Sequence, residues 1–142
     1  MGEKIVVPAR VRNYMIDSYG HMNNAQYLIL LEEARTQFLE RVGFPLEELL
    51  RQGLLIFINE IQIRFKRPAL LGERLEIFNW FPVLSRARVT WRQEIRLENG
   101  GELVAAATVS GGFIKNGRVI PIPPEIYQVM QVYYIPAEPD LK

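Results

Sequence analysis

One segment of this sequence, residues 25–42, has the apolar spacing of a long helix, and the segments after residue 53 have the pattern of strands. Apolar side chains recur along it every three or four residues, which places them on one helical face. These are Tyr27, Leu31, Ala34, Phe38 and Val42. Because Leu28, Ile29 and Leu30 make the first half apolar almost all round, we expect that half to be buried. The strands must cover this helix, which restricts the fold to a sheet wrapped around it.

The strand-like segments alternate apolar and polar residues and are joined by short turns. The alternation is clearest where Val89, Trp91, Ile95 and Leu97 share one face. In the last long segment, three successive alanines predict close helix packing, and a Gly-Gly pair predicts a bulge or bend. We predict strands over 4–15, 54–65, 74–81, 86–97 and 102–115, and short helices over 46–52 and 123–134. The expected fold class is α+β, an antiparallel β-sheet wrapped around one long central helix.

Composition limits the possible chemistry. The 142 residues fit a single domain over 1–142, with a frayed tail from about 135. A formal net charge of +1 disfavours nucleic acid as a partner. The chain has no cysteine and one histidine, His21, so thiolate sites are excluded and we expect no metal and no separate cofactor. Neither a signal peptide nor a membrane span is predicted, which favours a soluble cytoplasmic protein.

The loop before the long helix, DSYGHMNNAQY at residues 17–27, holds the strongest chemical signal. It delivers a carboxylate, Asp17, and then the first turn of a buried helix, whose free N–H groups can polarise a carbonyl and hold an oxyanion. A nearby carboxylate can attack that carbonyl or deprotonate a water. Gly20 would let the backbone approach a ligand. The pattern predicts acyl hydrolysis.

The same loop resembles a known family. Asp17, Gly20, His21, Asn23, Asn24 and Tyr27 match the D-x-x-G-H-x-N-N-x-x-Y signature of the 4-hydroxybenzoyl-CoA thioesterase-like branch of the hot-dog proteins. The likeness continues in order through LEEAR at 31–35, RVGFP at 41–45, FKRPALLGERLEI at 65–77, LSRARVTW at 84–91 and NGRVIPIP at 116–123. It implies a hot-dog fold and a homodimer or homotetramer with sites between subunits. It also assigns the catalytic carboxylate to Asp17 and the carbonyl-polarising backbone N–H to Asn24.

The other candidate site residues have competing structural roles. His21 is either a general base or a loop brace, and Asn23 is either a substrate contact or a helix cap. Tyr27 is a pocket candidate that could equally belong to the core. Glu60 interrupts an apolar strand and would need a partner if buried. Two basic clusters at strand ends are candidates for binding the phosphates of coenzyme A: Lys66 with Arg67, and Ser85 with Arg86 and Arg88.

We therefore expect hydrolysis of an acyl-CoA or acyl-carrier-protein thioester to a free acid and a thiol. Asp17 would act as nucleophile or as general base, and the residues leave both roles open. The nearest alternative is a hot-dog hydratase or dehydratase that adds water to an enoyl thioester. A further alternative is a non-catalytic module that binds acyl thioesters.

Overall fold

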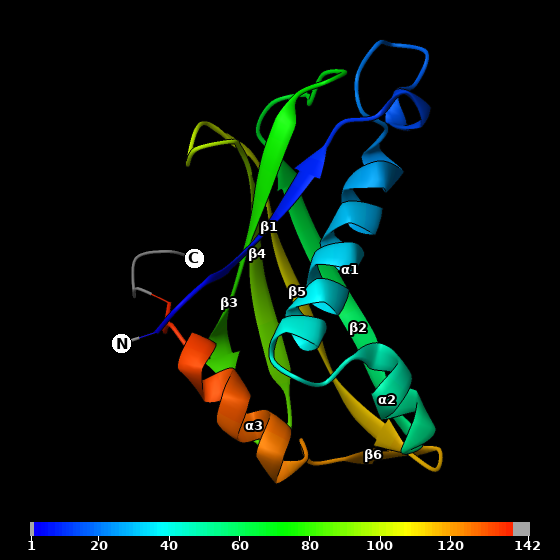
Figure 1. Cartoon of the computed structure of the whole chain (residues 1–142), viewed down its shortest axis with the longest axis vertical. Coiled ribbons are helices and arrows are strands. Elements are labelled where there is room, and N and C mark those ends of the chain that lie inside the picture. Colours follow the sequence, from blue (N-terminus) through cyan, green and yellow to red (C-terminus); the bar gives the residue numbers. More distant parts are fainter. Residues whose placement is uncertain (1, 138–142) are drawn as a thin grey trace.

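The computed structural model describes residues 2–137 and contains one curved antiparallel sheet with a long helix, α1, against it (Figure 1). The sheet has the strand order β1-β3-β4-β5-β2, and a short strand, β6, pairs with the end of β5. The strands are β1 (Ile5–Arg10), β2 (Leu54–Phe65), β3 (Arg74–Leu84), β4 (Val89–Leu97), β5 (Leu103–Lys115) and β6 (Arg118–Ile120). The helices are α1 (Asn24–Arg41), α2 (Leu46–Arg51) and α3 (Pro124–Met130), with 3₁₀ turns η1 (Asn13–Met15) and η2 (Gln131–Tyr133). This is the predicted hot-dog architecture.

The core lies between α1 and the face of the sheet that curves around it. Phe38 of α1 is fully buried, and its ring meets Phe81, Trp91 and Tyr133 edge-on at centroid separations of 5.0–5.3 Å. Edge-to-face packing of this kind adds about 0.5–1.5 kcal/mol per pair beyond simple burial. On β5, Ala105 and Ala107 are both 1% exposed within this core.

The first half of α1 is less buried than the sequence predicts. Leu30 and Leu31 lie in the core, but Leu28 is 40% exposed and Ile29 is 55% exposed. A single sheet covers only one side of a helix, so the apolar residues on the far side have no cover within this chain. The expectation of a helix buried all round its first half is therefore wrong for the monomer.

Several element boundaries also differ from the prediction. The expected first strand over 4–15 ends at Arg10 and is followed by η1, and β4 begins at Val89 instead of residue 86. β3 extends past the predicted end at 81 to Leu84, and β6 was not predicted at all. The helix predicted over 123–134 ends at Met130. Within the expected frayed tail, the Ile135 N–H donates to the Phe81 carbonyl at 2.9 Å, and residues 138–142 lie outside the described part.

A β-bulge lies in β2, opposite the β5 glycines at which a bulge or bend was predicted. The register between β2 and β5 shifts between Ile58 and Glu60, opposite Gly111 and Ser110. A Cβ on Gly111 would lie 1.9 Å from the Phe57 carbonyl oxygen, so only glycine permits this close approach of the two backbones.

The long axis of the molecule separates two groups of loops. The loop between β1 and α1 and the turn between β2 and β3 lie at the upper end in Figure 1. The turn between β3 and β4 lies at the opposite end, near β6, where the Ile122 N–H donates to the Arg86 carbonyl at 2.7 Å. We call these the loop end, residues 10–24 and 66–74, and the turn end, residues 85–88 with 115–122.

Candidate active site

The loop that carries Asp17 is closed by its own backbone. The Asp17 N–H donates to the His21 carbonyl at 3.0 Å, and the Gly20 N–H donates to the Asp17 carbonyl at 3.0 Å. An isolated antiparallel bridge joins Ile16 to Met22 just outside them. Gly20 has φ +81°, in the left-handed region that favours glycine, and a Cβ there would meet no atom within 4 Å. The glycine is thus required by the turn, and it leaves open space beside the loop.

Asp17 itself is half-buried, and one of its carboxylate oxygens has a structural role. Its Oδ1 accepts a hydrogen bond from the Tyr19 N–H at 2.9 Å, which is the turn role considered from the sequence. Among residues 2–137, the second carboxylate oxygen has no hydrogen-bond partner. The turn therefore fixes the carboxyl group while leaving one oxygen for another contact.

The start of α1 is capped in a way that leaves one donor free. The Asn23 side chain accepts from the Ala25 N–H at 2.8 Å, and the Asn23 carbonyl accepts from the Gln26 N–H at 2.9 Å. This is the helix-cap role considered for Asn23. The Asn24 N–H, in the first position of the helix, donates to no acceptor within the described chain. It has the free, helix-terminal character that polarising a carbonyl requires.

Tyr27 ties this loop to the turn between β2 and β3. The ring is only 2% exposed and packs edge-on against Phe65 at 5.0 Å. Its hydroxyl accepts from the Ala69 N–H at 3.0 Å, and the Ala69 carbonyl accepts from the Met22 N–H at 2.9 Å. In this chain Tyr27 is a core residue that braces the two loops against each other.

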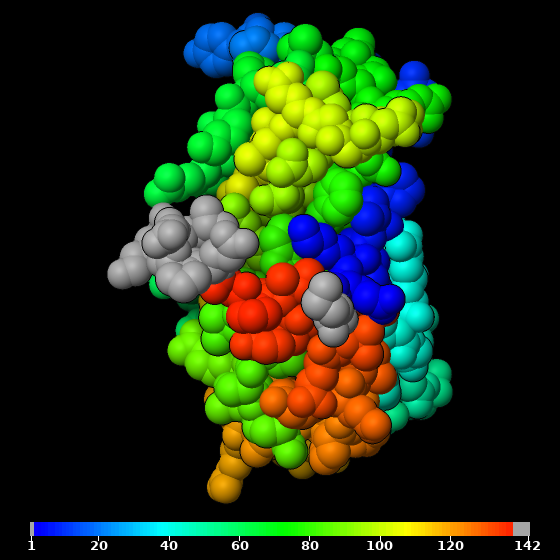
Figure 2. Space-filling model, turned by 90° about the vertical axis from the view of Figure 1, so that its left-hand side faces the viewer, coloured from blue at the N-terminus to red at the C-terminus, as the bar shows by residue number. Residues whose placement is uncertain are grey.

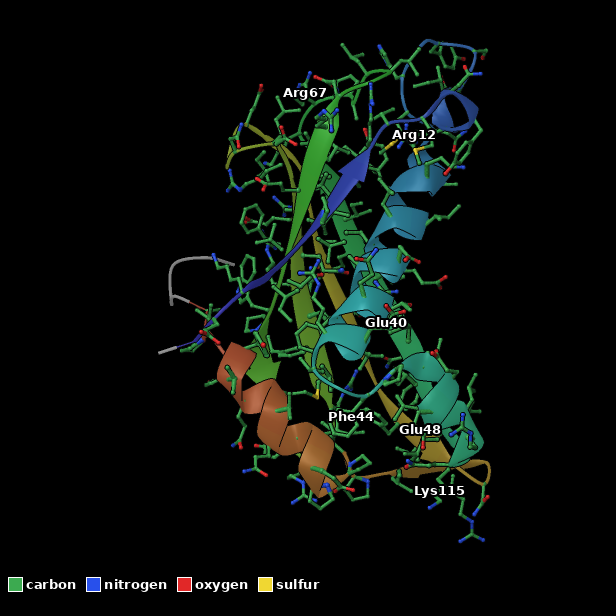
Figure 3. The ribbon with its side chains drawn as sticks, viewed as in Figure 1. Arg12, Glu40, Phe44, Glu48, Arg67 and Lys115 are labelled. Atoms are coloured by element: carbon green, nitrogen blue, oxygen red, sulfur yellow. The ribbon has the colours of Figure 1, made fainter. Side chains whose placement is uncertain are left out.

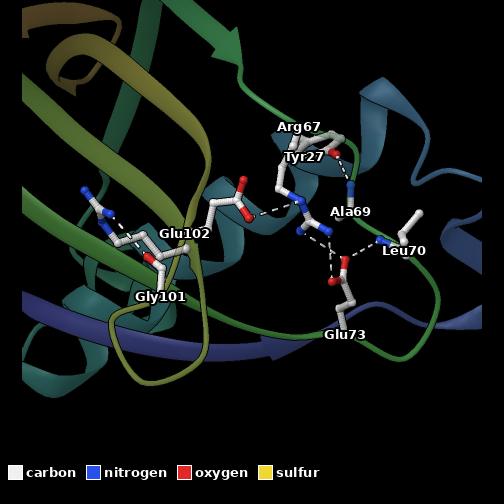
Figure 4. Close-up of polar contacts among 8 residues, drawn as sticks. Tyr27, Arg67, Ala69, Leu70, Glu73, Gly101 and Glu102 are labelled. Atoms are coloured by element: carbon white, nitrogen blue, oxygen red, sulfur yellow. Dashed lines mark hydrogen bonds and ion pairs between the residues drawn. The ribbon is translucent and has the colours of Figure 1, made fainter.

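The turn between β2 and β3 is itself braced by an ion pair (Figure 4). Arg67 makes two hydrogen bonds to Glu73, at 3.0 and 3.2 Å, and lies 3.8 Å from a Glu102 carboxylate oxygen. Glu73 also accepts from the Leu70 N–H at 2.7 Å. The hydrogen bond to Glu73 raises the pKa of the Arg67 guanidinium. Burial alone would raise the pKa of Glu73, but the contacts with Arg67 and the Leu70 N–H outweigh it and lower that pKa.

The second predicted basic cluster lies at the turn end. Ser85 Oγ accepts from the N–H groups of Ala87 and Arg88 at 3.3 and 3.2 Å, so Ser85 shapes the turn. The Arg86 guanidinium donates to the Ile122 carbonyl at 3.3 Å and lies 5.4 Å from the ring centre of Tyr127. The Arg88 guanidinium donates to the Asn59 side chain at 3.2 Å. Among the described residues, neither arginine has a carboxylate within 4 Å.

An open hollow of about 300 Å³ lies beside this turn, lined by Arg86, Ala87, Val119, Ile120 and Pro121. A smaller apolar cavity lies between α1, α3 and the sheet, next to Gly111. Asp17 lines neither space. The predicted site residues are thus divided: Asp17, Gly20, His21, Asn23 and Asn24 share one closed loop, and the Arg86 cluster is at the far end.

Two further candidates are solvent-exposed side chains. Glu60 follows the bulge of β2 and is exposed, so it does not need the partner that a buried carboxylate would need. Lys66 is exposed at the end of β2, and its backbone N–H donates to the Val104 carbonyl at 2.8 Å. The His21 side chain is exposed as well, while its carbonyl closes the Asp17 loop.

Sequence reasoning missed a buried polar chain between α1 and the sheet. Gln93 and Asn79 are both fully buried opposite each other on β4 and β3. Gln93 donates to Asn79 Oδ1 at 2.7 Å and to the Leu31 carbonyl at 3.0 Å, and it accepts from Arg35 at 2.9 Å. Burial lowers the pKa of the Arg35 guanidinium. Each of the two residues interrupts an otherwise apolar alternation, a signal that a buried partner was required.

Comparison with known proteins identifies the family. The family model of the thioesterase-like superfamily matches residues 11–130. The chain belongs to the thioesterase-like superfamily. It is 35% identical over 101 residues to the long-chain acyl-CoA thioesterase FadM of Escherichia coli, a match that covers 71% of this chain and 76% of FadM. A putative esterase of Aquifex aeolicus is 29% identical, over 86% of this chain and 94% of its own length.

Solved structures support the same placement. The crystal structure of a hypothetical protein from Aquifex aeolicus superposes with a TM-score of 0.84 at 28% identity, over 89% of this chain and 98% of that one. A Staphylococcus aureus protein solved in complex with CoA superposes with a TM-score of 0.88 at 18% identity, over 99% of this chain and 92% of that one, and shows the fold alone. The hot-dog fold is confirmed, and with the superfamily match so is the expectation of a thioester hydrolase.

Two features are absent from the described residues. No group of three or more His, Cys, Asp or Glu side chains within 2–137 is placed to hold a metal ion. None of the helices described there is both long and apolar enough to cross a bilayer.

Proposed function

We propose that the chain hydrolyses an acyl-CoA, or an acyl-carrier-protein thioester, to the free acid and the thiol. The observation that carries this proposal is the closed loop that holds Asp17 six residues before the Asn23 cap of α1. The Asn24 N–H that follows this cap has no acceptor within residues 2–137. The names of relatives such as FadM support the acyl-CoA substrate class. No metal or separate cofactor enters the reaction.

In the proposed reaction, the thioester oxygen accepts a hydrogen bond from the Asn24 N–H at the positive end of α1. The charge that develops on this oxygen is stabilised there, which lowers the barrier to attack. Asp17 then acts in one of two ways. As nucleophile it forms a mixed anhydride and releases the thiolate, and water later cleaves the anhydride. As general base it takes a proton from water, which attacks the carbonyl directly.

His21 and Asn23 would support this reaction from the same loop. His21 is an exposed imidazole four residues after Asp17, so it is placed to contact substrate or water at the loop surface. Asn23 sets the start of α1, and its substitution would disturb the Asn24 N–H indirectly. Gly20 leaves room for the substrate beside them. Glu60 and Lys66 remain predicted substrate contacts from the exposed part of β2 and its end.

For the phosphates of CoA, the contacts favour the cluster at the turn end over Arg67. The Arg67 guanidinium is already engaged by Glu73 and Glu102, whereas within residues 2–137 Arg86 and Arg88 have only neutral acceptors, and Arg86 lines an open hollow. A phosphate would gain two charge-assisted contacts there without breaking an ion pair. We therefore assign the nucleotide end of CoA to Arg86 and Arg88, with Ser85 shaping the turn.

We further propose a homodimer, or a homotetramer built from such dimers, joined along β2. Within residues 2–137 the outer edge of β2 has no partner strand, and it carries the exposed side chains Leu55, Ile61 and Phe65. An open apolar edge of this length favours strand pairing. Antiparallel pairing about a twofold axis reverses the partner, so the turn end of one subunit would lie beside the loop end of the other. The site would then combine Asp17 of one subunit with Arg86 and Arg88 of its partner.

We place this enzyme in the cytoplasm, consistent with a chain that has no cysteine.

Substitution of Asp17 by Asn tests the proposal, because asparagine keeps the turn but cannot act as base or nucleophile in the same way. Thioester hydrolysis by Asp17→Asn should fall by about 10²-fold or more. Ser18→Ala, a change in the same loop at an exposed residue, is the control and should retain activity. The assay would use aromatic, short-chain and long-chain acyl-CoAs and, in parallel, hydration of an enoyl-CoA. Full hydrolysis by Asp17→Asn, or water addition without thioester cleavage, would contradict the proposal. Thioester binding without turnover by the wild type would show a binding module instead.

A further inference from the structure

The loop end presents an unusual group of apolar side chains to solvent. Tyr19 is 84% exposed and Tyr14 is 74% exposed, the two largest values among the large apolar side chains of the described residues. In the neighbouring turn, Leu71 is 60% exposed and Leu70 is 43% exposed. Figure 2 shows the blue atoms of the first loop beside the green atoms of the second at the upper end of the molecule. Exposed apolar groups gathered at one end indicate a contact surface.

These side chains are held outward by a braced backbone. The Glu73 N–H donates to the Leu70 carbonyl at 3.1 Å and the Glu73 carboxylate accepts from the Leu70 N–H, which closes the turn that carries both leucines. The Gly72 N–H donates to the Val11 carbonyl at 2.9 Å and joins this turn to the other loop. The leucines therefore cannot fold back onto the core without breaking these bonds.

The loop end carries more basic than acidic residues, as the turn end also does. It holds five of the 17 Lys and Arg residues but only two of the 16 Asp and Glu residues, and one of those two, Glu73, is paired with Arg67. Arg10, Arg12 and Lys66 are exposed there, without a carboxylate within 4 Å in the described chain. Figure 3 shows Arg12 and Arg67 near this end and Lys115 at the other.

We propose that the loop end binds the surface of an anionic lipid membrane. Tyr14, Tyr19, Leu70 and Leu71 would enter the headgroup region, where tyrosine places its ring in apolar surroundings and its hydroxyl in water. The surrounding cations would contact the lipid phosphates.

The surface would have a use in the proposed function, although the binding does not depend on it. The same loop end holds Asp17 and the start of α1. A thioester with a long acyl chain is an amphiphile that partitions into bilayers, so docking would bring the site to the layer where that substrate collects. This consequence rests on the proposed function. The membrane contact itself rests on exposure and charge.

Sedimentation with vesicles tests the proposal on the full-length protein. Wild type should bind phosphatidylcholine vesicles that contain phosphatidylglycerol at least about tenfold more tightly than pure phosphatidylcholine, and added salt should weaken the binding. The double variant Leu70→Ser, Leu71→Ser should lose about tenfold or more in affinity, as should Arg10→Gln, Arg12→Gln. The control is Val83→Ser, Val132→Ser, which removes exposed apolar groups outside both the loop end and the turn end and should bind as wild type.

Three results would overturn this inference: no sedimentation of the wild type with anionic vesicles, equal losses in the loop-end and control variants, or a change of oligomeric state in Leu70→Ser, Leu71→Ser on gel filtration. The last would assign the leucines to a subunit contact. Circular dichroism melting and hydrolysis of a short-chain acyl-CoA would establish that each variant is folded. Asp17→Asn should still bind vesicles. The vesicle experiment therefore tests membrane binding even if the proposed hydrolysis is wrong.

Discussion

The two ends of the molecule carry arginines of the same type in opposite situations. At the loop end, Arg67 is held by Glu73 and Glu102 and braces a turn beside the loop that carries Asp17. At the turn end, beside an open hollow, Arg86 and Arg88 donate only to a carbonyl and an amide among the described residues. The partner of an arginine thus decides its role: a paired guanidinium stabilises the fold, and one with neutral acceptors is available to an anionic ligand.

Mixed assemblies give the largest expected effect, because they test whether the two ends cooperate across subunits. Asp17→Asn alone should be inactive, and Arg86→Ala, Arg88→Ala should hydrolyse poorly at low acyl-CoA. An assembly that contains one subunit of each would hold one site with both the carboxylate and the arginines. Its activity at low substrate should rise about tenfold or more above that of Asp17→Asn, in line with the contribution of the general base. If hydrolysis never exceeds the average of the two parents, both ends act within one chain.

Arg67→Met should lower stability. It leaves the Glu73 carboxylate, whose side chain is 23% exposed, with only the Leu70 N–H as a donor. The free energy of unfolding, measured by urea denaturation, should fall by about 2 kcal/mol, with the KM for acyl-CoA little changed. A variant of unaltered stability whose KM rises would show instead that Arg67 contacts the substrate.

The double variant Arg86→Ala, Arg88→Ala should show the opposite of Arg67→Met: weaker substrate binding with stability unchanged. The KM for acyl-CoA should rise about tenfold, equivalent to about 1.4 kcal/mol of lost binding, while kcat and the melting temperature stay close to wild type. A matched substrate that ends at the pantetheine, without the nucleotide phosphates, should be hydrolysed equally by both proteins. A wild-type KM for the full acyl-CoA in this variant would remove the turn end from substrate binding.

Lowering the pH should reduce the stability of the protein through Glu73 at the loop end. This is the smallest of the expected effects. Because the folded-state pKa of Glu73 lies below its ordinary value of 4.5, the stability from this carboxylate is present above that value. It is lost as the pH falls through the lower folded-state pKa. Glu73→Gln should be less stable than wild type at neutral pH, and the difference should shrink as the pH is lowered past 4.5 towards the folded-state pKa. Urea denaturation over a pH series measures this, and a gap that stays constant in acid would contradict it.

The sequence predicted the parts of this protein that depend on local patterns. The period of residues 25–42 indicated α1, the alternation after Val89 indicated β4, and DSYGHMNNAQY indicated the loop that carries Asp17. Each of these features is a property of neighbours along the chain, so it can be recognised without coordinates.

Other features were decided only by tertiary structure. Leu28 and Ile29 are exposed because the sheet covers just one side of α1, and no helical pattern states how much cover is present. Lys66–Arg67 and Arg86–Arg88 look alike in the sequence, but the path of the chain brings Glu73 and Glu102 to Arg67 and only neutral acceptors to Arg86 and Arg88. The sequence alone determined which residue types are present and on which element each lies. Three-dimensional packing decided which charges meet, because an ion pair depends on distance in space. The residues next to a charged side chain in the sequence do not reveal its partner.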